Sequence, residues 1–163
     1  MAIEYEGSVE QVHQALRDEQ YWLTRLADSG ADDYSLDSMT VRGDGIYVKT
    51  TQTLRADRLP AVVAQFHRGD LSFVREERWT PIRDGHATAT VNGSITGAPA
   101  MLSGTAVLAS ANSGGGSRMD FNATVQVDVP LVGGKIENFI GSQLVDLLIA
   151  EQRFTTVWIT GNA

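Results

Sequence analysis

Two polar residues, Gln143 and Glu151, interrupt the apolar side of a long helix that the C-terminal sequence predicts. A few polar groups among apolar side chains are typical of a small-molecule site, where they orient the polar end of a ligand. Buried polar groups also need partners, so the two residues have a structural interpretation as well, in which they bond to the backbone or to Arg75 or Arg78. The sequence favours the structural role for Glu151 and does not separate the two roles for Gln143.

A charged pair is predicted on one strand of the sheet that this helix would cover. Successive side chains of a strand point to opposite faces, so Arg75 and Glu77 share a face with Trp79, whereas Glu76 points away. An internal arginine or glutamate is costly unless it is paired. This pair is therefore the place where acid–base chemistry would be sought, although the sequence assigns no catalytic residue.

Other kinds of chemistry find no support in the sequence. Its three histidines, His13, His67 and His86, have no metal-pair spacing, and the chain contains no cysteine. Gly133-Gly134 fails the phosphate-loop pattern because Val129 stands where that pattern needs a glycine. No Gly-x-Ser-x-Gly elbow is present. We therefore expect no metal, no cofactor and no nucleophilic hydrolysis.

Composition and charge restrict the partners. Thirteen basic against twenty acidic residues give a net charge of -7, which opposes docking on nucleic acid or an anionic membrane. No stretch approaches the roughly 20 apolar residues of a membrane span, and the N-terminus has no signal-peptide pattern. The sequence predicts a single domain over residues 1–163, in the cytosol, with no nucleic-acid partner and no stable membrane insertion. It leaves the oligomeric state open.

The predicted elements run from a first strand and two short helices, through antiparallel strands, to the long helix. Ser8 and Gln11 form a capping box that opens the first short helix, and Asp18 can begin the second. Alternation predicts strands at 3–7, 34–41, 46–55, 71–79, 86–95, 100–110 and 117–129, with a short helix over 57–66. Strands segregated from helices indicate an α+β fold. Only the C-terminal helix is long enough to cover the apolar face of the sheet.

Four segments resemble a known superfamily: Arg78-Trp-Thr-Pro81, Gly97-Ala-Pro-Ala-Met-Leu-Ser-Gly-Thr105, Val129-Pro-Leu-Val-Gly-Gly-Lys-Ile-Glu137, and Glu151-Gln-Arg-Phe154 with Trp158. With this order of elements, the chain resembles the START-like superfamily (SRPBCC; polyketide cyclase and birch-pollen-allergen type) and its helix-grip fold. More closely, it resembles an actinobacterial family of unknown function within that superfamily. The resemblance implies a curved antiparallel sheet gripping the long helix, with an internal cavity for an apolar molecule. It implies no reaction, because the superfamily mixes lipid carriers, ligand sensors, cyclases and toxins.

We therefore predict a non-enzymatic protein that binds or carries a small apolar molecule or lipid between the sheet and the C-terminal helix. The residues expected to line the cavity are Val48, Phe73, Arg75, Val91, Phe121, Ile140, Gln143, Leu144, Leu147 and Glu151. Two alternatives stay open at this point. One is a polyketide cyclase or dehydratase that uses the same cavity, and the other is a toxin-like protein-interaction module that needs no cavity.

Overall fold

The computed structural model describes residues 1–65, 67–111, 115–131 and 133–161. Val132, within the segment 129–137 that carries part of the resemblance, and Phe66, at the end of a predicted helix, lie outside these ranges. The elements in chain order are β1 (Ala2–Tyr5), α1 (Val9–Leu16), α2 (Glu19–Asp28), β2 (Asp33–Arg42), β3 (Gly45–Leu54), the 3-10 helix η1 (Ala56–Arg58), α3 (Ala61–Ala64), β4 (Leu71–Trp79), β5 (Ala87–Ile95), β6 (Ala100–Ser110), β7 (Ser117–Val127) and α4 (Gly133–Gly161).

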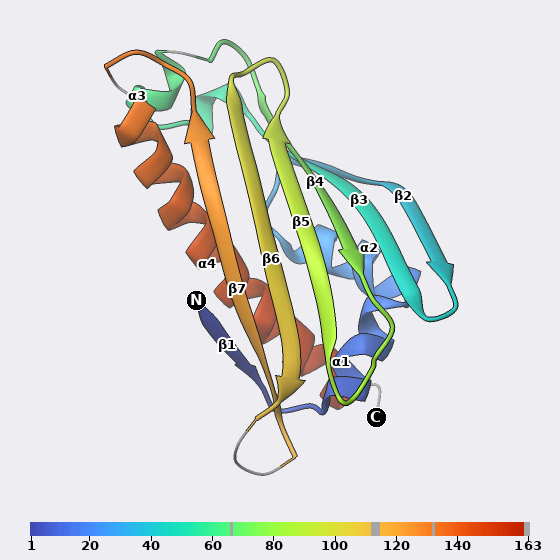
Figure 1. Ribbon diagram of the computed structural model, residues 1–163. Coiled ribbons are helices and arrows are strands. Elements are labelled where there is room, and N and C mark those ends of the chain that lie inside the picture. The colour runs from blue at the N-terminus through green and yellow to red at the C-terminus, as the bar shows by residue number, and fades with distance from the viewer. Residues whose placement is uncertain (66, 112–114, 132, 162–163) are drawn as a thin grey trace.

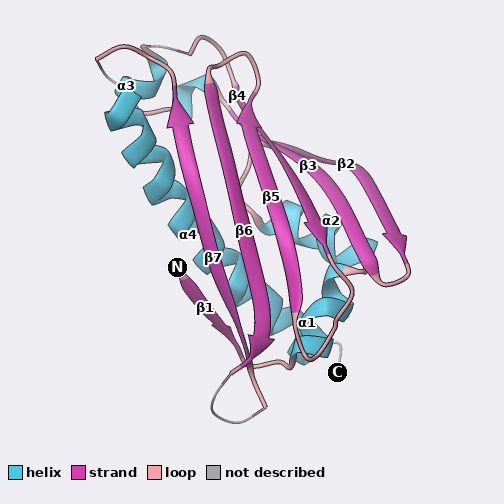
Figure 2. Ribbon diagram, viewed as in Figure 1, coloured by secondary structure: helices cyan, strands magenta, loops and turns pink. Residues whose placement is uncertain are grey.

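The strands form one antiparallel sheet with the order β1-β7-β6-β5-β4-β3-β2. The sheet curves, and α4 runs diagonally behind it from the end of β7 to the neighbourhood of α1 (Figure 1). Helices α1 and α2 lie on the same side as α4 (Figure 2). The predicted α+β fold, with its long C-terminal helix and two short helices after the first strand, is confirmed. None of the described helices is both long and apolar enough to cross a membrane.

Local sequence signals account for the two short helices. The Ser8 side chain accepts a hydrogen bond from the Gln11 backbone N–H, and the Gln11 side chain accepts one from the Ser8 backbone N–H, which is the predicted capping box. The Asp18 side chain then accepts from the backbone N–H of Gln20 and begins α2. The indole N–H of Trp22, a fully buried side chain, donates to the Leu16 carbonyl at 2.8 Å. This bond fixes α2 against the end of α1.

The helix predicted over 57–66 is instead two short pieces, η1 and α3. Pro60 explains the break, because a proline disfavours helical backbone in the residue that precedes it. Leu59 is accordingly extended, with φ -82° and ψ 138°. Pro60 therefore caps the start of α3 rather than sitting in the first turn of a longer helix.

Small residues run across the middle of the inner face of the sheet. The pairing places Val91 beside Gly104, and Gly104 beside Ala123, so neighbouring strands contribute one row. An adjacent row places Arg75 beside Gly93. With little side-chain volume on this part of the sheet, the space under α4 is available to the long side chains of β4 and of the helix.

Gly104→Ala tests how tightly this row is built, and we expect it to cost about 1–3 kcal/mol of folding free energy. A Cβ at Gly104 would lie 2.7 Å from the Asn122 carbonyl oxygen, which is part of the sheet backbone. The matched control is Gly93→Ala, where the Cβ would meet the ring of Phe73 at 2.8 Å. Because that ring is a side chain and can turn, Gly93→Ala should lower the free energy of unfolding, measured in urea, clearly less than Gly104→Ala does. Equal costs would contradict this account.

Candidate functional site

Four charged side chains meet under α4, and we call Arg25, Arg75, Glu77 and Glu151 the buried ion cluster. Arg75 donates from Nη1 and Nη2 to the two carboxylate oxygens of Glu151, at 3.3 and 2.6 Å. Arg25 Nη2 lies 3.3 Å from Glu151 Oε2 and 3.7 Å from Glu77 Oε2. Arg75 Nε lies 3.4 Å from Glu77 Oε2. The cluster joins α2, β4 and α4, which are far apart in the sequence.

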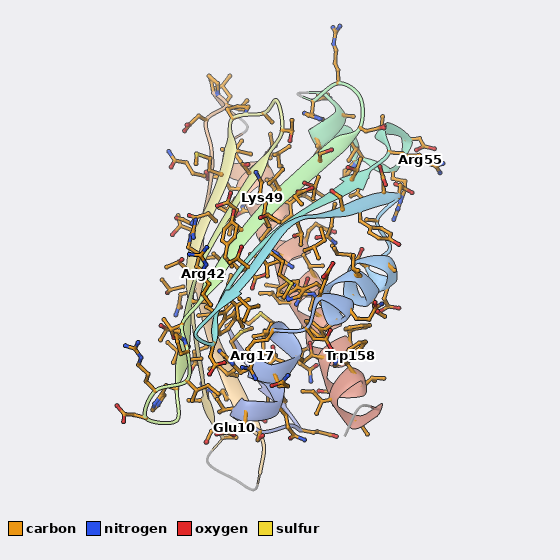
Figure 3. All side chains as sticks on the ribbon, turned by 90° about the vertical axis from the view of Figure 1, so that its right-hand side faces the viewer. Glu10, Arg17, Arg42, Lys49, Arg55 and Trp158 are labelled. Atoms are coloured by element: carbon orange, nitrogen blue, oxygen red, sulfur yellow. The ribbon has the colours of Figure 1, made fainter. Side chains whose placement is uncertain are left out.

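An aromatic and polar shell supports the cluster. The Arg25 guanidinium lies over the Trp22 ring, 4.2 Å from its centroid, a cation–π arrangement. The Trp79 indole N–H donates to Glu77 Oε1 at 3.2 Å. Tyr21 stands edge-on to Trp158 of α4, with centroids 5.7 Å apart (Trp158 is labelled in Figure 3). These contacts hold both Arg25 and Glu77 in one orientation.

The proton positions around Tyr21 follow from its partners. The Thr155 hydroxyl donates its proton to the Glu151 backbone carbonyl oxygen at 2.7 Å, so it cannot donate to Tyr21 as well. The Tyr21 hydroxyl, 2.6 Å from Thr155 Oγ1, must then donate to Thr155. The Tyr21 oxygen in turn accepts from Arg25 Nη1 at 3.2 Å. A continuous chain of hydrogen bonds therefore links Arg25 to the backbone of α4.

The ionised forms of these groups stabilise one another. Burial alone would lower the pKa of Arg25 and Arg75, but the carboxylates of Glu151 and Glu77 outweigh burial and raise it. Burial would likewise raise the pKa of Glu151, but Arg25 and Arg75 hold that pKa below its ordinary value. Burial raises the pKa of the Tyr5 phenol, which also borders the site. Glu151 is thus a carboxylate at neutral pH.

The lowered pKa of Glu151 predicts a loss of stability in acid. The unfolded chain has the ordinary pKa of 4.5, so as the pH falls through this value the unfolded state takes up a proton that the folded state does not. The contribution of Glu151 is fully present above the ordinary pKa and decreases below it. We expect the free energy of unfolding of the native protein to fall more steeply between pH 6 and about 3.5 than that of the variant Arg75→Met/Glu151→Leu. Parallel curves from urea unfolding would contradict this.

A cavity borders the buried ion cluster. Its lining combines the four charged residues with a mainly apolar wall: Tyr5, Val12, Leu16, Tyr21, Arg25, Arg75, Glu77, Trp79, Val91, Ala106, Met119, Phe121, Leu144, Leu148, Glu151 and Thr155. Its volume is about 40 Å³, which is room for roughly three water molecules. Pockets for drug-sized ligands are about 300–1,000 Å³. The cavity is therefore too small for a ligand of that size in this conformation.

The seam between β7 and α4 is less well packed than the rest of the interface. Ala123 lies on the inner face of β7, between buried Phe121 and half-buried Val125, yet it is exposed. Opposite it, no residue of α4 from 137 to 147 is buried, although Ile136 and Leu148 on either side are. Strand β1 pairs only with residues 117–120 of β7, so the seam lies beyond its cover. We call Ala123, Val125, Ile140 and Leu144 the β7–α4 seam.

The structure distributes the predicted lining residues over several places. Those on the cavity wall are Arg75, Val91, Phe121, Leu144 and Glu151. Phe73 and Ile140 line a separate, smaller pocket of about 10 Å³ toward the start of α4. Val48 is buried in the core, Leu147 is half-buried, and Gln143 is exposed; none of these three lines either pocket. The predicted pairing of Arg75 with Glu77 and with Glu151 is present.

Sequence reasoning missed the contribution of α2 to the site. Arg25 is 8% exposed and sits among Tyr21, Trp22 and Leu26, all buried, in the same face of the helix. An arginine within an apolar stripe at spacings of three and four residues was the available signal. On α4, Leu148 and Thr155 were also missed. Across the described ranges, no group of three or more His, Asp or Glu side chains is placed to hold a metal ion.

Comparison with known proteins identifies relatives of the whole chain. Residues 1–159 match the family described as "Protein of unknown function (DUF2505)". Uncharacterized proteins of Mycobacterium tuberculosis and Mycobacterium bovis are each 50% identical over 167 residues, covering 99% of this chain and 96% of theirs.

Two solved structures share the fold at low sequence identity. A conserved protein from Geobacillus kaustophilus has a TM-score of 0.59 at 17% identity, over 98% of this chain and 93% of that one. A protein from Thermus thermophilus has a TM-score of 0.62 at 11% identity, over 100% of this chain and 97% of that one.

The predicted relationship to an actinobacterial family of unknown function is confirmed by the sequence matches, and the chain belongs to the family of proteins of unknown function DUF2505.

Proposed function

We propose that this protein binds a small, mainly apolar molecule between the sheet and α4, with the polar end of that molecule at the buried ion cluster. The observation that carries the proposal is the position of the cluster, at the wall of a cavity that is otherwise mainly apolar. Burial of the apolar part of the ligand would supply affinity. Arg75 and Glu151 would orient its polar end.

Stability alone does not require charged residues at this place. Buried ion pairs are often no more stabilising than well-packed apolar residues of similar volume, because desolvation of the charges offsets their attraction. Here two arginines and two glutamates occupy the centre of the interface that holds α4 on the sheet. A fold that needed only a core at this place would be served as well by leucine and methionine.

Binding of a lipid-sized ligand requires the small cavity to expand. The β7–α4 seam is the place where this costs least, because the helix there buries few side chains and Ala123 is exposed. Displacement of α4 residues 137–147 from β7 would join the 40 Å³ cavity with the smaller pocket at Phe73 and Ile140. The same seam would serve as the portal for the ligand.

Binding without catalysis fits the cluster better than acid–base chemistry does. Both carboxylates are ion-paired, and a glutamate whose pKa is held below its ordinary value is a weak base and no acid at neutral pH. No described surface feature favours the interaction-module alternative. We infer that the family is a branch of the START-like superfamily with a cytosolic carrier or sensor function, on the strength of the resemblance given above.

Native mass spectrometry of protein purified from a mycobacterial host tests the proposal. We expect a lipid-sized adduct that organic extraction removes, and a weaker or absent adduct on Arg75→Met/Glu151→Leu. The matched control is Arg78→Met, because Arg78 lies on the same strand but is exposed on the opposite face, over the Tyr47 ring. An adduct-free native protein that also fails to bind the neutral dye Nile red would overturn the proposal.

A further inference from the structure

We infer that the polar end of the ligand is an uncharged hydrogen-bond acceptor, such as an ester, carbonyl or hydroxyl oxygen, and not a free carboxylate. This inference rests on the proposed function and makes it more specific. It depends on the charge balance of the buried ion cluster and on one fully buried donor of the cluster, Arg75 Nε, that makes no hydrogen bond.

The cluster is electrically balanced. Two guanidinium groups face two carboxylates, and each guanidinium lies within 3.7 Å of both of them. The charges are also shielded from water, since Arg75 is 4% and Arg25 8% exposed. A buried site with equal numbers of positive and negative charges has no net attraction for either kind of ion.

Most hydrogen-bonding groups around the cavity already bond to one another or to the backbone. Both Nη atoms of Arg75 donate to Glu151, and the Trp79 indole N–H donates to Glu77. The Tyr21 and Thr155 hydroxyls are joined to each other and to the backbone of α4. Arg75 Nε differs, because this buried N–H has no hydrogen-bond partner among the described residues. Its contact with Glu77 Oε2, at 3.4 Å, is an ion pair without hydrogen-bond geometry.

An acceptor oxygen placed at Arg75 Nε would satisfy this donor. If the oxygen belonged to a carboxylate, a third negative charge would enter a region with two positive ones, close to Glu77 and Glu151. It would be repelled there and would also lose its hydration. A cationic group would not be stabilised there either, because both carboxylates are already paired with arginines. A neutral oxygen gains the hydrogen bond without either cost.

The inference is tested by displacement of bound Nile red at pH 8. Three probes with a twelve-carbon acyl or alkyl chain are compared: methyl dodecanoate, 1-dodecanol and dodecanoic acid. On the native protein we expect the ester and the alcohol to displace the dye at about tenfold lower concentration than the acid, which equals about 1.4 kcal/mol. Glu77→Gln removes one negative charge and keeps an acceptor for the Trp79 N–H, so its preference should shift toward the acid.

The control variant is Glu76→Gln, which neutralises the neighbouring carboxylate on the outer face, where it pairs with Lys49 at 4.0 Å (Lys49 is labelled in Figure 3). It should keep the native preference. If Glu77→Gln does not fold, lowering the pH toward 5.5 on the native protein should improve displacement by the acid alone, as its carboxylate gains a proton. An acid that displaces as well as the ester from the native protein overturns this inference and leaves the proposed function standing. Failure of Nile red and all three probes to bind overturns both.

Discussion

Glu151→Leu is expected to lower the free energy of unfolding by about 3–5 kcal/mol, whereas Arg75→Met/Glu151→Leu should recover most of that loss. The single change removes the carboxylate that both Arg25 and Arg75 face, at 3.3 and 2.6 Å. Two buried guanidinium groups would then share only Glu77. The double change removes one charge of each sign and leaves Arg25 with Glu77, which is a balanced pair.

A double-mutant cycle in urea measures this coupling. Arg75→Met alone should also be strongly destabilising, because it leaves two carboxylates with one arginine, and the two single losses should exceed the loss in the double variant by several kcal/mol. The control is Glu76→Gln on the outer face of β4, whose half-exposed pair with Lys49 should contribute less than about 1 kcal/mol. Single losses that simply add in the double variant would show that the cluster is not a coupled unit.

The cycle also separates stability from function. A double variant that is as stable as the native protein but no longer retains a ligand would show that the cluster is kept for binding. A native protein clearly more stable than every apolar replacement would instead assign the cluster a structural role, and it would remove the main support for a ligand site.

The arrangement of strands and helices could be predicted because each element has its own local signal. Alternation with a period of two defines the strands, and the Ser8 capping box and Asp18 mark where α1 and α2 begin. The same alternation placed Arg75 and Glu77 on one face, opposite Glu76, which the sheet register bears out. An internal charged pair then needs a partner, and Glu151 is that partner.

The orientation of α4 about its axis was predicted only in part. Leu144 packs against the core and Glu151 lines the cavity, as expected. Gln143 is exposed, however, whereas Leu148, Thr155 and Ile159 are buried. Apolar residues lie around much of this helix, as in Leu147-Leu148 and in Val157-Trp158-Ile159, so periodicity leaves the direction of its buried side poorly determined. Packing against α2 decides it, because Thr155 can reach Tyr21 of that helix only when this side faces inward.

The role of Arg25 depends on tertiary packing in the same way. Its position on α2 is readable as an arginine within an apolar stripe, but its distance to Glu151 depends on how α2 docks beside α4. The size of the cavity is equally a property of the packed state. Small residues such as Gly93 and Gly104 leave room on the inner face of the sheet, but long side chains from β4 and α4 fill most of it.

Ala123→Trp is expected to slow ligand uptake by about tenfold or more without lowering stability. Ala123 is an exposed residue on the inner face of β7, in the β7–α4 seam. An indole at this position can bury about 150–250 Å² and would cover the half-buried side chains of Ile140 and Leu144 on α4. It would therefore fill the opening through which we propose that a ligand passes.

Stopped-flow fluorescence with Nile red measures the effect as an association rate. The matched control is Asn122→Trp, since Asn122 precedes Ala123 on the same strand, is exposed, and points to the outer face. It adds the same indole within one residue of the seam but leaves the seam open. If both tryptophans slow association equally, the effect is not one of access. If Ala123→Trp binds the dye as fast as the native protein does, ligands do not enter between β7 and α4, and the portal must be sought at another boundary of the sheet.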